Sequence, residues 1–280
     1  MKLGNIADRA VIVTADGAAD IAAQSGGRFG PDVAGVLERW VEFREWAQAA
    51  DLTFSPYRES EVGPPVARPR QVFAIALNYR AHAVESGFSV PTTPSVFTKF
   101  ASSIAGPTGE IALVDGDVDW EVELVAVIGT EARKVPEQRA WDHVAGLTIG
   151  QDVSERRTQL AGEKPQFSLA KSHPGFSPIG PWIVTPDELE NPDDLLLECE
   201  RNGDIVQSSR TSDLVFSVPA LVSRLSEIVT LYPGDLIFTG TPAGVALGDP
   251  DVPYLTAGDT LTTRIEGLGS MHHRFVSATS

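Results

Sequence analysis

The sequence predicts a mixed α+β fold, rich in β-strands, with a small domain at its N-terminus. Many short apolar runs are separated by glycine and proline, a pattern typical of strands joined by turns. Longer stripes of apolar residues at helical spacing occur over 31–49 and 217–229. With 280 residues, of which 42% are hydrophobic, the chain can bury a substantial core.

The first 29 residues are expected to form short strands, of which the clearest runs from Arg9 to Thr14. A helix is then predicted over 31–49, because Pro31 suits a first helical position and the apolar residues after it recur at helical spacing. This apolar stripe indicates packing rather than a functional surface.

A linker is predicted over 54–70, where four prolines interrupt regular structure. We therefore place a domain boundary near residue 68. The chain is expected to divide into a small α+β domain over 1–68 and a larger domain over 69–280.

Short strands and a few helices are expected beyond the linker. Strands are predicted over 72–77, 95–99, 122–128, 147–150, 195–200, 204–208, 260–266 and 271–276, and a further strand runs into a Gly/Pro loop within 233–245. Helices are predicted over 78–85, 136–144 and 217–229, the last with Leu221, Val222, Leu225 and Ile228 facing inward, and a loop over 102–110. Asn202-Gly203 predicts a two-residue hairpin turn.

The strand over 122–128 begins at a pair of carboxylates. Alternate side chains of a strand share one face, so Glu121 and Glu123 project together, and Val125 and Val127 follow them on that face. Two neighbouring carboxylates beside an apolar surface are costly unless they stay in water or a cation or a proton compensates them. The motif is therefore either a solvated strand end or a cation site.

A third carboxylate and a group of basic residues follow. Asp152 comes just after the apolar strand 147–150, where side chains are often presented to a site. Arg156, Arg157 and Lys171 lie within twenty residues of it. Such charges form either a solvated face or, in a chain that is acidic overall, a local site for an anion.

His82 and Glu85 are three residues apart in the helix predicted over 78–85. This spacing places them on one helix face and within reach of each other. A solvated surface pair and a catalytic pair would both have this spacing.

The composition limits the partners and the compartment. Twenty-two basic against 38 acidic residues give a formal net charge of −16, which argues against a nucleic-acid backbone or an anionic membrane surface as partner. An anionic substrate would need local positive charge. One cysteine, Cys199, excludes an internal disulfide, and neither a signal peptide nor an apolar run of about 18 residues is present. We expect a cytoplasmic protein.

Seven motifs, in this order along residues 70–276, together resemble the fumarylacetoacetate hydrolase superfamily. They are Leu77-Asn-Tyr-x-x-His82-x-x-Glu85, Trp120-Glu-x-Glu123-Leu, Asp152-Val-Ser-x-Arg156-x-x-Gln159, Lys171-Ser, Pro178-Ile-Gly-Pro181, Asn202-Gly203 and Pro233-Gly-Asp-x-Ile-x-Thr-Gly-Thr-Pro-x-Gly-Val245. Each motif alone is a weak signal, but their joint occurrence at compatible spacings is specific.

The resemblance implies a fold, an assembly and a metal site. The fold is a mixed β-sandwich roll, usually found in a homodimer. A divalent cation is held by the three carboxylates that match Glu121, Glu123 and Asp152. Hard carboxylate oxygens without cysteine or histidine suit Mg²⁺, with Mn²⁺ or Ca²⁺ able to substitute.

The resemblance also implies an activity on small anionic 2-oxo acids and β-diketones, most often hydrolysis of a carbon–carbon bond. His82 and Glu85 match the dyad that activates water, on a segment that tends to order when ligand binds. The positions that contact substrate or developing negative charge match Lys171, Arg156, Gln159 and Thr241.

The working hypothesis is hydrolysis of an acylpyruvate or a fumarylacetoacetate-like substrate. His82, oriented by Glu85, takes a proton from water, and the hydroxide attacks the distal keto carbon and expels an enolate. Mg²⁺ and Lys171 stabilise the negative charge of that enolate. Decarboxylation of oxaloacetate and isomerisation of a 2-hydroxyhepta-2,4-diene-1,7-dioate-type substrate would use the same enolate. A binding or scaffold protein without turnover is a further alternative, which the intact metal and dyad positions disfavour.

Two departures from the family pattern bear on substrate specificity. Many members continue the Lys-Ser motif with x-Asp-Thr-Phe, whereas here Lys171-Ser172 is followed by His173-Pro174-Gly175-Phe176. Arg157 stands where aspartate commonly follows the motif arginine. Both departures leave the metal triad intact and concern the loop near Lys171.

Overall fold

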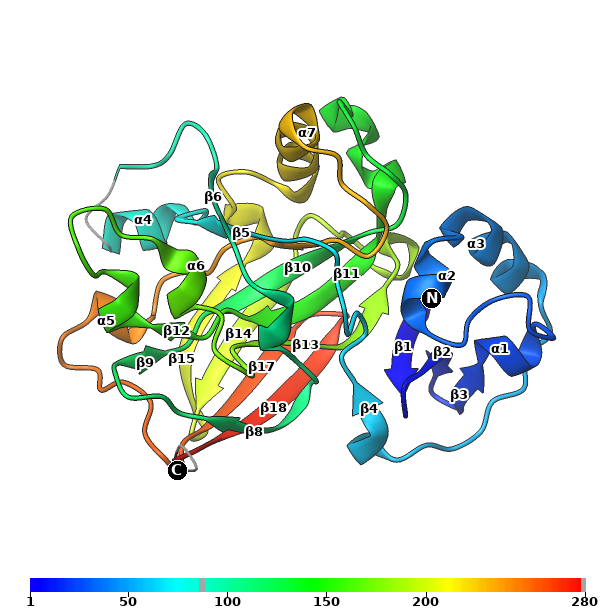
Figure 1. The fold of residues 1–280 in the computed structure, drawn as a ribbon, viewed down its shortest axis with the longest axis horizontal. Coiled ribbons are helices and arrows are strands. Elements are labelled where there is room, and N and C mark those ends of the chain that lie inside the picture. The colour runs from blue at the N-terminus through cyan, green and yellow to red at the C-terminus, as the bar shows by residue number, and fades with distance from the viewer. Residues whose placement is uncertain (86–88, 278–280) are drawn as a thin grey trace.

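The computed structural model describes residues 1–85 and 89–277, except for the side chains of Ala83 and Glu85, and confirms a mixed, β-rich fold (Figure 1). The strands are β1 (Lys2–Ile6), β2 (Arg9–Thr14), β3 (Gly17–Asp20), β4 (Val62–Gly63), β5 (Val72–Ala76), β6 (Ser95–Thr98), β7 (Ile104–Ala105), β8 (Thr108–Ala112), β9 (Val118–Asp119), β10 (Val122–Ile128), β11 (Val144–Gln151), β12 (Ser154–Glu155), β13 (Ser177–Val184), β14 (Leu196–Arg201), β15 (Asp204–Arg210), β16 (Leu236–Phe238), β17 (Thr260–Ile265) and β18 (Gly269–Val276). The α-helices are α1 (Ile21–Gln24), α2 (Val33–Leu37), α3 (Trp40–Ala49), α4 (Arg80–Glu85), α5 (Arg156–Gln159), α6 (Phe167–Ala170) and α7 (Val218–Ile228). The 3-10 helices are η1 (Glu59–Glu61), η2 (Ala101–Ser103), η3 (Glu137–His143), η4 (Pro186–Glu188), η5 (Thr211–Asp213) and η6 (Ala246–Gly248).

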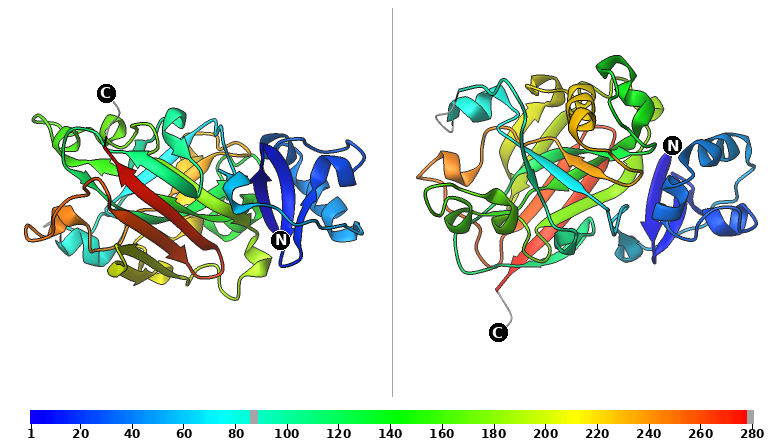
Figure 2. Two further views of the ribbon diagram at one scale, coloured as in Figure 1. Left: turned by 90° about the horizontal axis from the view of Figure 1, so that it is seen from below. Right: turned by 45° about the horizontal axis from the view of Figure 1, so that its top comes forward.

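Two sheets pack face to face around the main core (Figure 2). The larger runs in the order β3-β2-β1-β13-β11-β10-β16-β5-β6, with β4 paired to β1 and β7 to β13. The smaller runs in the order β15-β14-β17-β18-β8, and β9 pairs with β12 apart from both. Leu124 and Ile149 of the larger sheet share one hydrophobic cluster with Leu197, Ile265 and Phe275 of the smaller. Burial of this apolar area is the main stabilising term.

The N-terminal unit is joined to the larger sheet. Strand β1 pairs antiparallel with β13, so that Leu3 lies opposite Ile183. Trp40 of α3 packs against Gly129, where a Cβ atom would lie 2.7 Å from Trp40 Cδ1. Figure 1 shows this unit, in blue, at the end of the molecule away from α4, α5 and α6. The domain boundary near residue 68 stays a prediction, and the sheet continues across it.

The single helix predicted over 31–49 is wrong, because the segment forms α2 and α3. Asp32 rather than Pro31 sets the start, since its carboxylate accepts a hydrogen bond from a backbone N–H of the first turn of α2 (2.8 Å). Arg39 separates the helices with a non-helical backbone (φ −121°, ψ 36°). Its guanidinium donates to the Arg28 carbonyl oxygen (2.6 Å), a contact between segments that helical periodicity does not reveal.

Three shorter predictions also need correction. The predicted loop over 102–110 contains β7 and the start of β8, which pair in parallel with β13 and β18 and so depend on distant partners. The helix predicted over 136–144 is the 3-10 helix η3. Ile228, predicted to face inward, is 86% exposed at the last position of α7.

The predictions nearest the carboxylate motif are confirmed. Strands β10 and β11 are buried along their whole length and pair antiparallel. Val125 and Val127 lie together in a second hydrophobic cluster, so the face they share with Glu123 is apolar as expected. Asn202 and Gly203 both have positive φ (54° and 94°) and turn the hairpin between β14 and β15. Within the described ranges, no helix has the length and apolar character needed to cross a membrane.

Candidate active site

Three carboxylates meet where β10 begins and β11 ends. Glu121 precedes β10, Glu123 lies in it, and Asp152 follows β11. Because the strands run antiparallel, with Glu123 opposite Gly150, the start of one lies beside the end of the other. One oxygen of each carboxylate lies within 4.8 Å of the others, and all three side chains are buried. The carboxylate predicted from the end of a distant strand therefore joins the pair.

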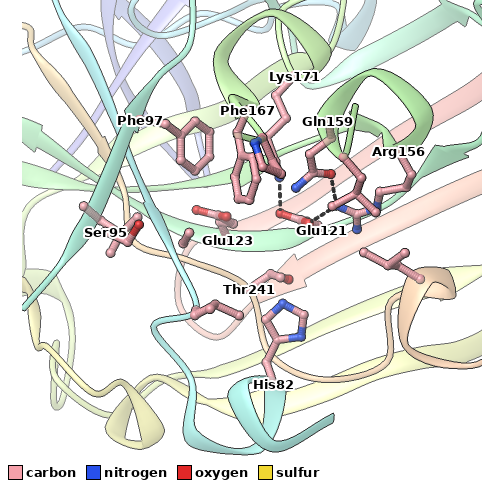
Figure 3. Close-up of a pocket in the computed structure, with 16 residues that line it drawn as sticks. His82, Ser95, Phe97, Glu121, Glu123, Arg156, Gln159, Phe167, Lys171 and Thr241 are labelled. Carbon is pink, nitrogen blue, oxygen red and sulfur yellow. Dashed lines mark hydrogen bonds and ion pairs between the residues drawn. The ribbon is translucent and has the colours of Figure 1, made fainter. Parts of the chain in front are cut away.

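Two buried cations pair with these carboxylates. Lys171 Nζ donates to Glu121 Oε2 (2.6 Å) and to Asp152 Oδ2 (2.7 Å). Arg156 Nη1 donates to Glu121 Oε1 (2.7 Å) and to Gln159 Oε1 (2.8 Å). Figure 3 shows Lys171 and Arg156 both bonded to Glu121. The positive charge expected for an anion site thus comes from helix α5 and from the end of α6.

Arg157 does not belong to this group, although its sequence neighbour does. Successive helix residues point about 100° apart, so Arg157 leaves α5 toward solvent. It is exposed and donates to Asp117 Oδ1 (2.8 Å). The departure from the family pattern at this position therefore lies in a surface ion pair.

Residues 173–176, the departure after Lys171, are not among the residues that line the cavity of the site. Ser172 Oγ donates to the Ser168 carbonyl oxygen (2.6 Å) and accepts from the Phe100 N–H (3.0 Å). The His173 ring lies edge-on to Phe176, with ring centroids 5.0 Å apart. These contacts hold the backbone at Lys171 against neighbouring loops.

Lys99, a residue that the sequence reasoning missed, completes the charge cluster. Its buried ammonium donates to Asp152 Oδ1 and to the Lys171 carbonyl oxygen. It therefore contacts one carboxylate of the triad and the backbone of a second cation. A single lysine just after a short strand carries no pattern that would have identified it.

Asp119 was also missed, although a signal existed. Its Oδ2 accepts from Arg156 Nε (2.9 Å) and Nη2 (2.7 Å), and so orients the guanidinium toward Glu121. Asp119, Glu121 and Glu123 are spaced by two, the period of side chains on one face of an extended chain. That spacing extends the acidic motif by one residue.

Burial and charge give the two glutamates different protonation behaviour. Burial raises the pKa of Glu121, but the Lys171 and Arg156 cations outweigh it and lower this pKa to about 2. Burial also raises the pKa of Glu123, and the carboxylates of Asp152 and Glu121 raise it further, well above its usual value. The neighbouring cations therefore do not compensate the charge of an ionised Glu123.

The two lysines also differ. Burial alone would lower the pKa of Lys171, but the charges of Asp152 and Glu121 outweigh it, and the pKa is raised. Burial dominates at Lys99 and lowers its pKa. Lys171 is thus held as an ammonium by the carboxylates it contacts.

The loop after β16 closes the site beside Glu123. The Gly240 N–H donates to Glu123 Oε2 (2.8 Å). Gly240 has a positive φ of 101°, and a Cβ there would lie 2.8 Å from Asn78 Cβ, so both conformation and space require glycine. Thr241 follows, with its Oγ1 accepting from Gln207 Nε2 (2.9 Å).

A cavity of about 510 Å³ opens onto these groups. The predicted site residues that line it are His82, Glu121, Glu123, Arg156, Gln159, Lys171 and Thr241. His82 reaches the cavity from α4 and faces the carboxylates from the side opposite Lys171 (Figure 3). The side chain of Glu85, its predicted partner, lies outside the described residues.

Helix α4 is anchored by Asn78, which lies two residues before its first residue, Arg80. Asn78 Nδ2 donates to the carbonyl oxygens of Phe216 (3.0 Å) and Thr239 (2.7 Å), and its Oδ1 accepts from the Phe216 N–H (2.8 Å). Asn78 is fully buried, so these bonds satisfy its whole amide. They fix the start of the segment that carries His82.

The donor set fits a divalent cation. Carboxylate oxygens are the ligands that Mg²⁺, Mn²⁺ and Ca²⁺ prefer, and three of them converge here. Four buried carboxyl groups face three buried cations, namely Asp119, Glu121, Glu123 and Asp152 against Lys99, Arg156 and Lys171. Burial is the first cause of the raised pKa of Glu123, and this excess of carboxylates adds to it; a divalent ion held by Glu121, Glu123 and Asp152 would stabilise the charged form of Glu123.

Residues 71–276 match the family model described as fumarylacetoacetate (FAA) hydrolase C-terminal. The chain belongs to the fumarylacetoacetate hydrolase family. The resemblance drawn from the seven motifs is confirmed, and the β-rich fold described above is the fold of this family. The matched region contains every predicted site residue of this family member.

Two relatives of this fumarylacetoacetate hydrolase family chain carry different activities in their names. One is a 2,4-didehydro-3-deoxy-L-rhamnonate hydrolase from Sphingomonas sp. (strain SKA58), 43% identical over 249 residues that cover 87% of each chain. The other is the human mitochondrial oxaloacetate tautomerase FAHD2A, 40% identical over 232 residues that cover 82% of this chain and 74% of the relative. The chain is an enzyme of a family that includes hydrolases and tautomerases.

A solved structure bears on the metal. Maleylpyruvate hydrolase from Sphingobium sp. SYK-6, in complex with manganese(II) and pyruvate, aligns with a TM-score of 0.82 and 29% identity over the whole of both chains. It is a family structure that contains a divalent metal ion, and the carboxylate triad of this chain is a possible divalent site of the same kind.

Proposed function

We propose that this chain is a Mg²⁺-dependent hydrolase that cleaves a carbon–carbon bond in a small anionic 2-oxo acid with a second keto group, of the acylpyruvate type. The observation that carries the proposal is the arrangement of one cavity, with His82 on one side and the buried carboxylate cluster on the other. A relative of known structure that binds manganese and pyruvate supports this substrate class.

The carboxylates of Glu121, Glu123 and Asp152 hold the cation. When bound, a divalent ion polarises the carbonyl of a 2-oxo acid and offsets the negative charge that develops on the enolate. Mn²⁺ and Ca²⁺ offer similar oxygen preferences and substitute for Mg²⁺.

His82 supplies the base. Its side chain lines the cavity, and an imidazole can accept a proton from water near neutral pH. The hydroxide formed attacks the distal keto carbon, the bond between that carbon and the pyruvyl methylene breaks, and the electron pair remains on the pyruvyl part as an enolate. Glu85, three residues further along α4, would orient the imidazole.

The remaining polar side chains bind the substrate and offset its negative charge. Lys171 places an ammonium beside the metal carboxylates and stabilises the enolate oxygen. Arg156, Gln159 and Thr241 line the cavity and bind the oxygens of the substrate. Arg156 does so from a fixed position, because Asp119 and Glu121 hold its guanidinium.

The test follows an acylpyruvate by ultraviolet absorbance with the Mg²⁺-loaded chain, in wild type and His82→Ala. We expect the variant to bind metal normally and to lose about 10²- to 10⁴-fold in kcat, the usual contribution of a general base. His272→Ala is the matched control, since His272 is exposed on β18. Near-full activity of His82→Ala would disprove the role of His82, and absence of turnover in wild type would disprove the proposed reaction.

A second candidate is tautomerisation of oxaloacetate, with decarboxylation or diene-dioate isomerisation as related uses of the same site. The specific observation in its favour is 40% identity to a relative named as an oxaloacetate tautomerase. Loss of the enol absorbance without loss of total oxaloacetate identifies tautomerisation, and release of carbon dioxide identifies decarboxylation. Either result, together with no cleavage of acylpyruvates, would replace the hydrolase proposal.

A further inference from the structure

The cavity has two chemically different ends. The inner end carries the carboxylates, Lys171, Arg156 and His82. The remaining lining residues, apart from Gln159 and Thr241, form what we call the outer end, which is apolar except for Ser95. Its apolar members are Ile75, Ala76, Leu77, Phe97, Leu160, Pro165, Phe167 and Leu247.

Two aromatic rings of this apolar lining contact each other. Phe97 of β6 and Phe167 of α6 meet edge to face, with centroids 5.6 Å apart and an interplanar angle of 67°. The ammonium of Lys171 lies 5.3 Å from the Phe97 centroid, so the apolar wall begins directly beside the charged end. A ligand that extends from Lys171 along the apolar lining can therefore contact these rings.

The rim of the cavity is apolar as well. Leu160, after α5, is 48% exposed, and Leu247, in η6, is 38% exposed, yet both line the cavity. Because both leucines line the cavity and are partly exposed, a ligand that reaches them can cover them. A ligand that covers them gains burial of apolar area.

No cation in the described lining is available for a second carboxylate. Arg156 and Lys171 are the basic residues of that lining, and both are paired with carboxylates at the inner end. Arg157 and Lys164 are exposed and lie outside the lining, and Arg157 is paired with Asp117. In the sequence, residues 86–94, which follow α4, contain neither lysine nor arginine.

An unpaired carboxylate on this wall would lose its hydration without a compensating charge, which is strongly unfavourable. An apolar group there would instead gain about three- to fourfold in affinity for each buried methylene. We infer that the group on the distal keto carbon of the substrate is an uncharged alkyl or aryl group and not a second carboxylate. The inference rests on the proposed function, because it concerns the distal half of the same cavity.

The test compares two ligands of equal length that differ at one end. The Mn²⁺-loaded chain is titrated with 2-oxohexanoate, which ends in a methyl group, and with 2-oxoadipate, which ends in a carboxylate. We expect 2-oxohexanoate to bind at least about tenfold more tightly, and affinity to rise by about three- to fourfold per methylene from pyruvate upward. Equal or tighter binding of 2-oxoadipate would overturn the inference.

Two variants that each add a positive charge test whether the missing cation determines the ligand preference. Leu160→Arg places a cation at the rim and should shift the preference toward 2-oxoadipate by about tenfold or more, the scale of a charge-assisted pair. Leu169→Arg adds the same charge on nearby helix α6, but Leu169 is 68% exposed and outside the lining, so the preference should not move. An equal shift in both variants, or none in Leu160→Arg, would contradict the proposed wall.

Measurements of turnover distinguish a failure of this inference from a failure of the proposed function. An acylpyruvate with a linear alkyl group should be cleaved with a higher kcat/KM than its equivalent with a terminal carboxylate. Preference for the carboxylate-bearing substrate would overturn the inference and leave the hydrolase intact. If neither is cleaved, the proposed hydrolysis is wrong, and the binding preference for 2-oxohexanoate or 2-oxoadipate still decides the character of the cavity.

Discussion

Glu121 and Glu123 share one strand face but differ in their environment. Glu121 contacts Lys171 and Arg156, which stabilise its charged form. Glu123 accepts one backbone N–H from Gly240 and faces the other two carboxylates, so its charged form is destabilised. In the proposed metal site Glu121 would already be ionised, whereas Glu123 would have to lose a proton before it could bind the ion.

We predict that binding of Mg²⁺ or Mn²⁺ releases a proton, mainly from Glu123. Its pKa is raised by burial, by Asp152 and by Glu121, so the group binds a proton in the metal-free chain at pH values where an ordinary glutamate is ionised. Metal affinity should therefore fall as the pH is lowered through this raised pKa. Titration calorimetry in buffers of different ionisation enthalpy measures the protons released, and a pH-independent affinity with no proton release would contradict the prediction.

Lys99 provides a second prediction, because its ammonium is fully buried against Asp152. Lys99→Met should lower the free energy of unfolding of the metal-free chain by about 3–5 kcal/mol, the usual cost of removing one partner of a buried ion pair. The charge imbalance then grows, so saturating Mn²⁺ should raise the melting temperature more in the variant than in wild type. Thermal unfolding with and without Mn²⁺ measures both effects.

The control for Lys99 is Lys164→Met, which removes an exposed ammonium. It should change neither the stability nor the effect of Mn²⁺. An unchanged stability of Lys99→Met, or a smaller stabilisation by Mn²⁺ than in wild type, would show that Lys99 does not balance the charge of the carboxylate cluster.

At the scale of elements, the site depends on how strands and loops end. Strand β16 pairs with β10 and with β5, so the loop after β16 lies beside both Glu123 and the segment that leads to α4. Gly240 touches both of these, through its N–H to Glu123 and its close approach to Asn78. One loop thus contacts both a carboxylate of the cluster and the segment that leads to the helix carrying His82.

We predict that Gly240→Ala weakens metal binding and destabilises the chain. The new Cβ would lie 2.8 Å from Asn78 Cβ and 3.0 Å from the Ile75 carbonyl oxygen, in addition to the strain of a φ of 101°. Gly258→Ala is the matched control, since Gly258 has a φ of 102° and nothing within 4 Å of the position of its Cβ. It should show only the backbone strain, about 1–3 kcal/mol.

Titration with Mn²⁺ and chemical denaturation separate the two variants. Gly240→Ala should lose more stability than Gly258→Ala and should also lose metal affinity. Equal effects would mean that the close packing of this loop on Asn78 is not needed for the site.

At the scale of the whole molecule, residues on both sides of the predicted boundary near residue 68 share one core. Leu3, Trp40 and Phe43 belong to the same hydrophobic cluster as Val125 and Val127 of β10. The homodimer and the cytoplasmic location expected from the sequence remain predictions at this scale, and light scattering of the purified chain would decide the first.

We predict that residues 69–280 alone are much less stable than the full chain. Deletion of 1–68 uncovers the β13 edge and the apolar face of β10. Thermal unfolding should show a lower midpoint or no cooperative transition, and addition of the fragment 1–68 in trans should restore part of the lost stability. Unfolding of 69–280 at the midpoint of the full chain would show that the larger unit is an independent domain.

Local patterns in the sequence were enough to predict much of the fold and part of the site. The strands around Glu123 and the hairpin at Asn202 follow from periodicity and turn chemistry, which depend on neighbouring residues. The acidic pair stood out because neighbouring carboxylates beside an apolar surface need compensation or solvent. Asp152 stood out because it follows an apolar strand, and His82 because Glu85 follows it at helical spacing. The prediction of one long helix over 31–49 was wrong for two reasons. Asp32 caps the start of α2, and a contact of Arg39 with the distant Arg28 carbonyl oxygen separates α2 from α3.

Only the tertiary structure decided which charges meet. Arg156 and Arg157 are adjacent and chemically identical, but one orientation on α5 places the first against Glu121 and the second in solvent. Lys99 reaches the Lys171 carbonyl oxygen, where β6 packs on α6, and also Asp152 at the end of β11, so it joins segments far apart in the chain. Periodicity reports which face of an element is buried, whereas the identity of the opposing group depends on how distant elements pack, and in this chain that packing builds the charged cavity.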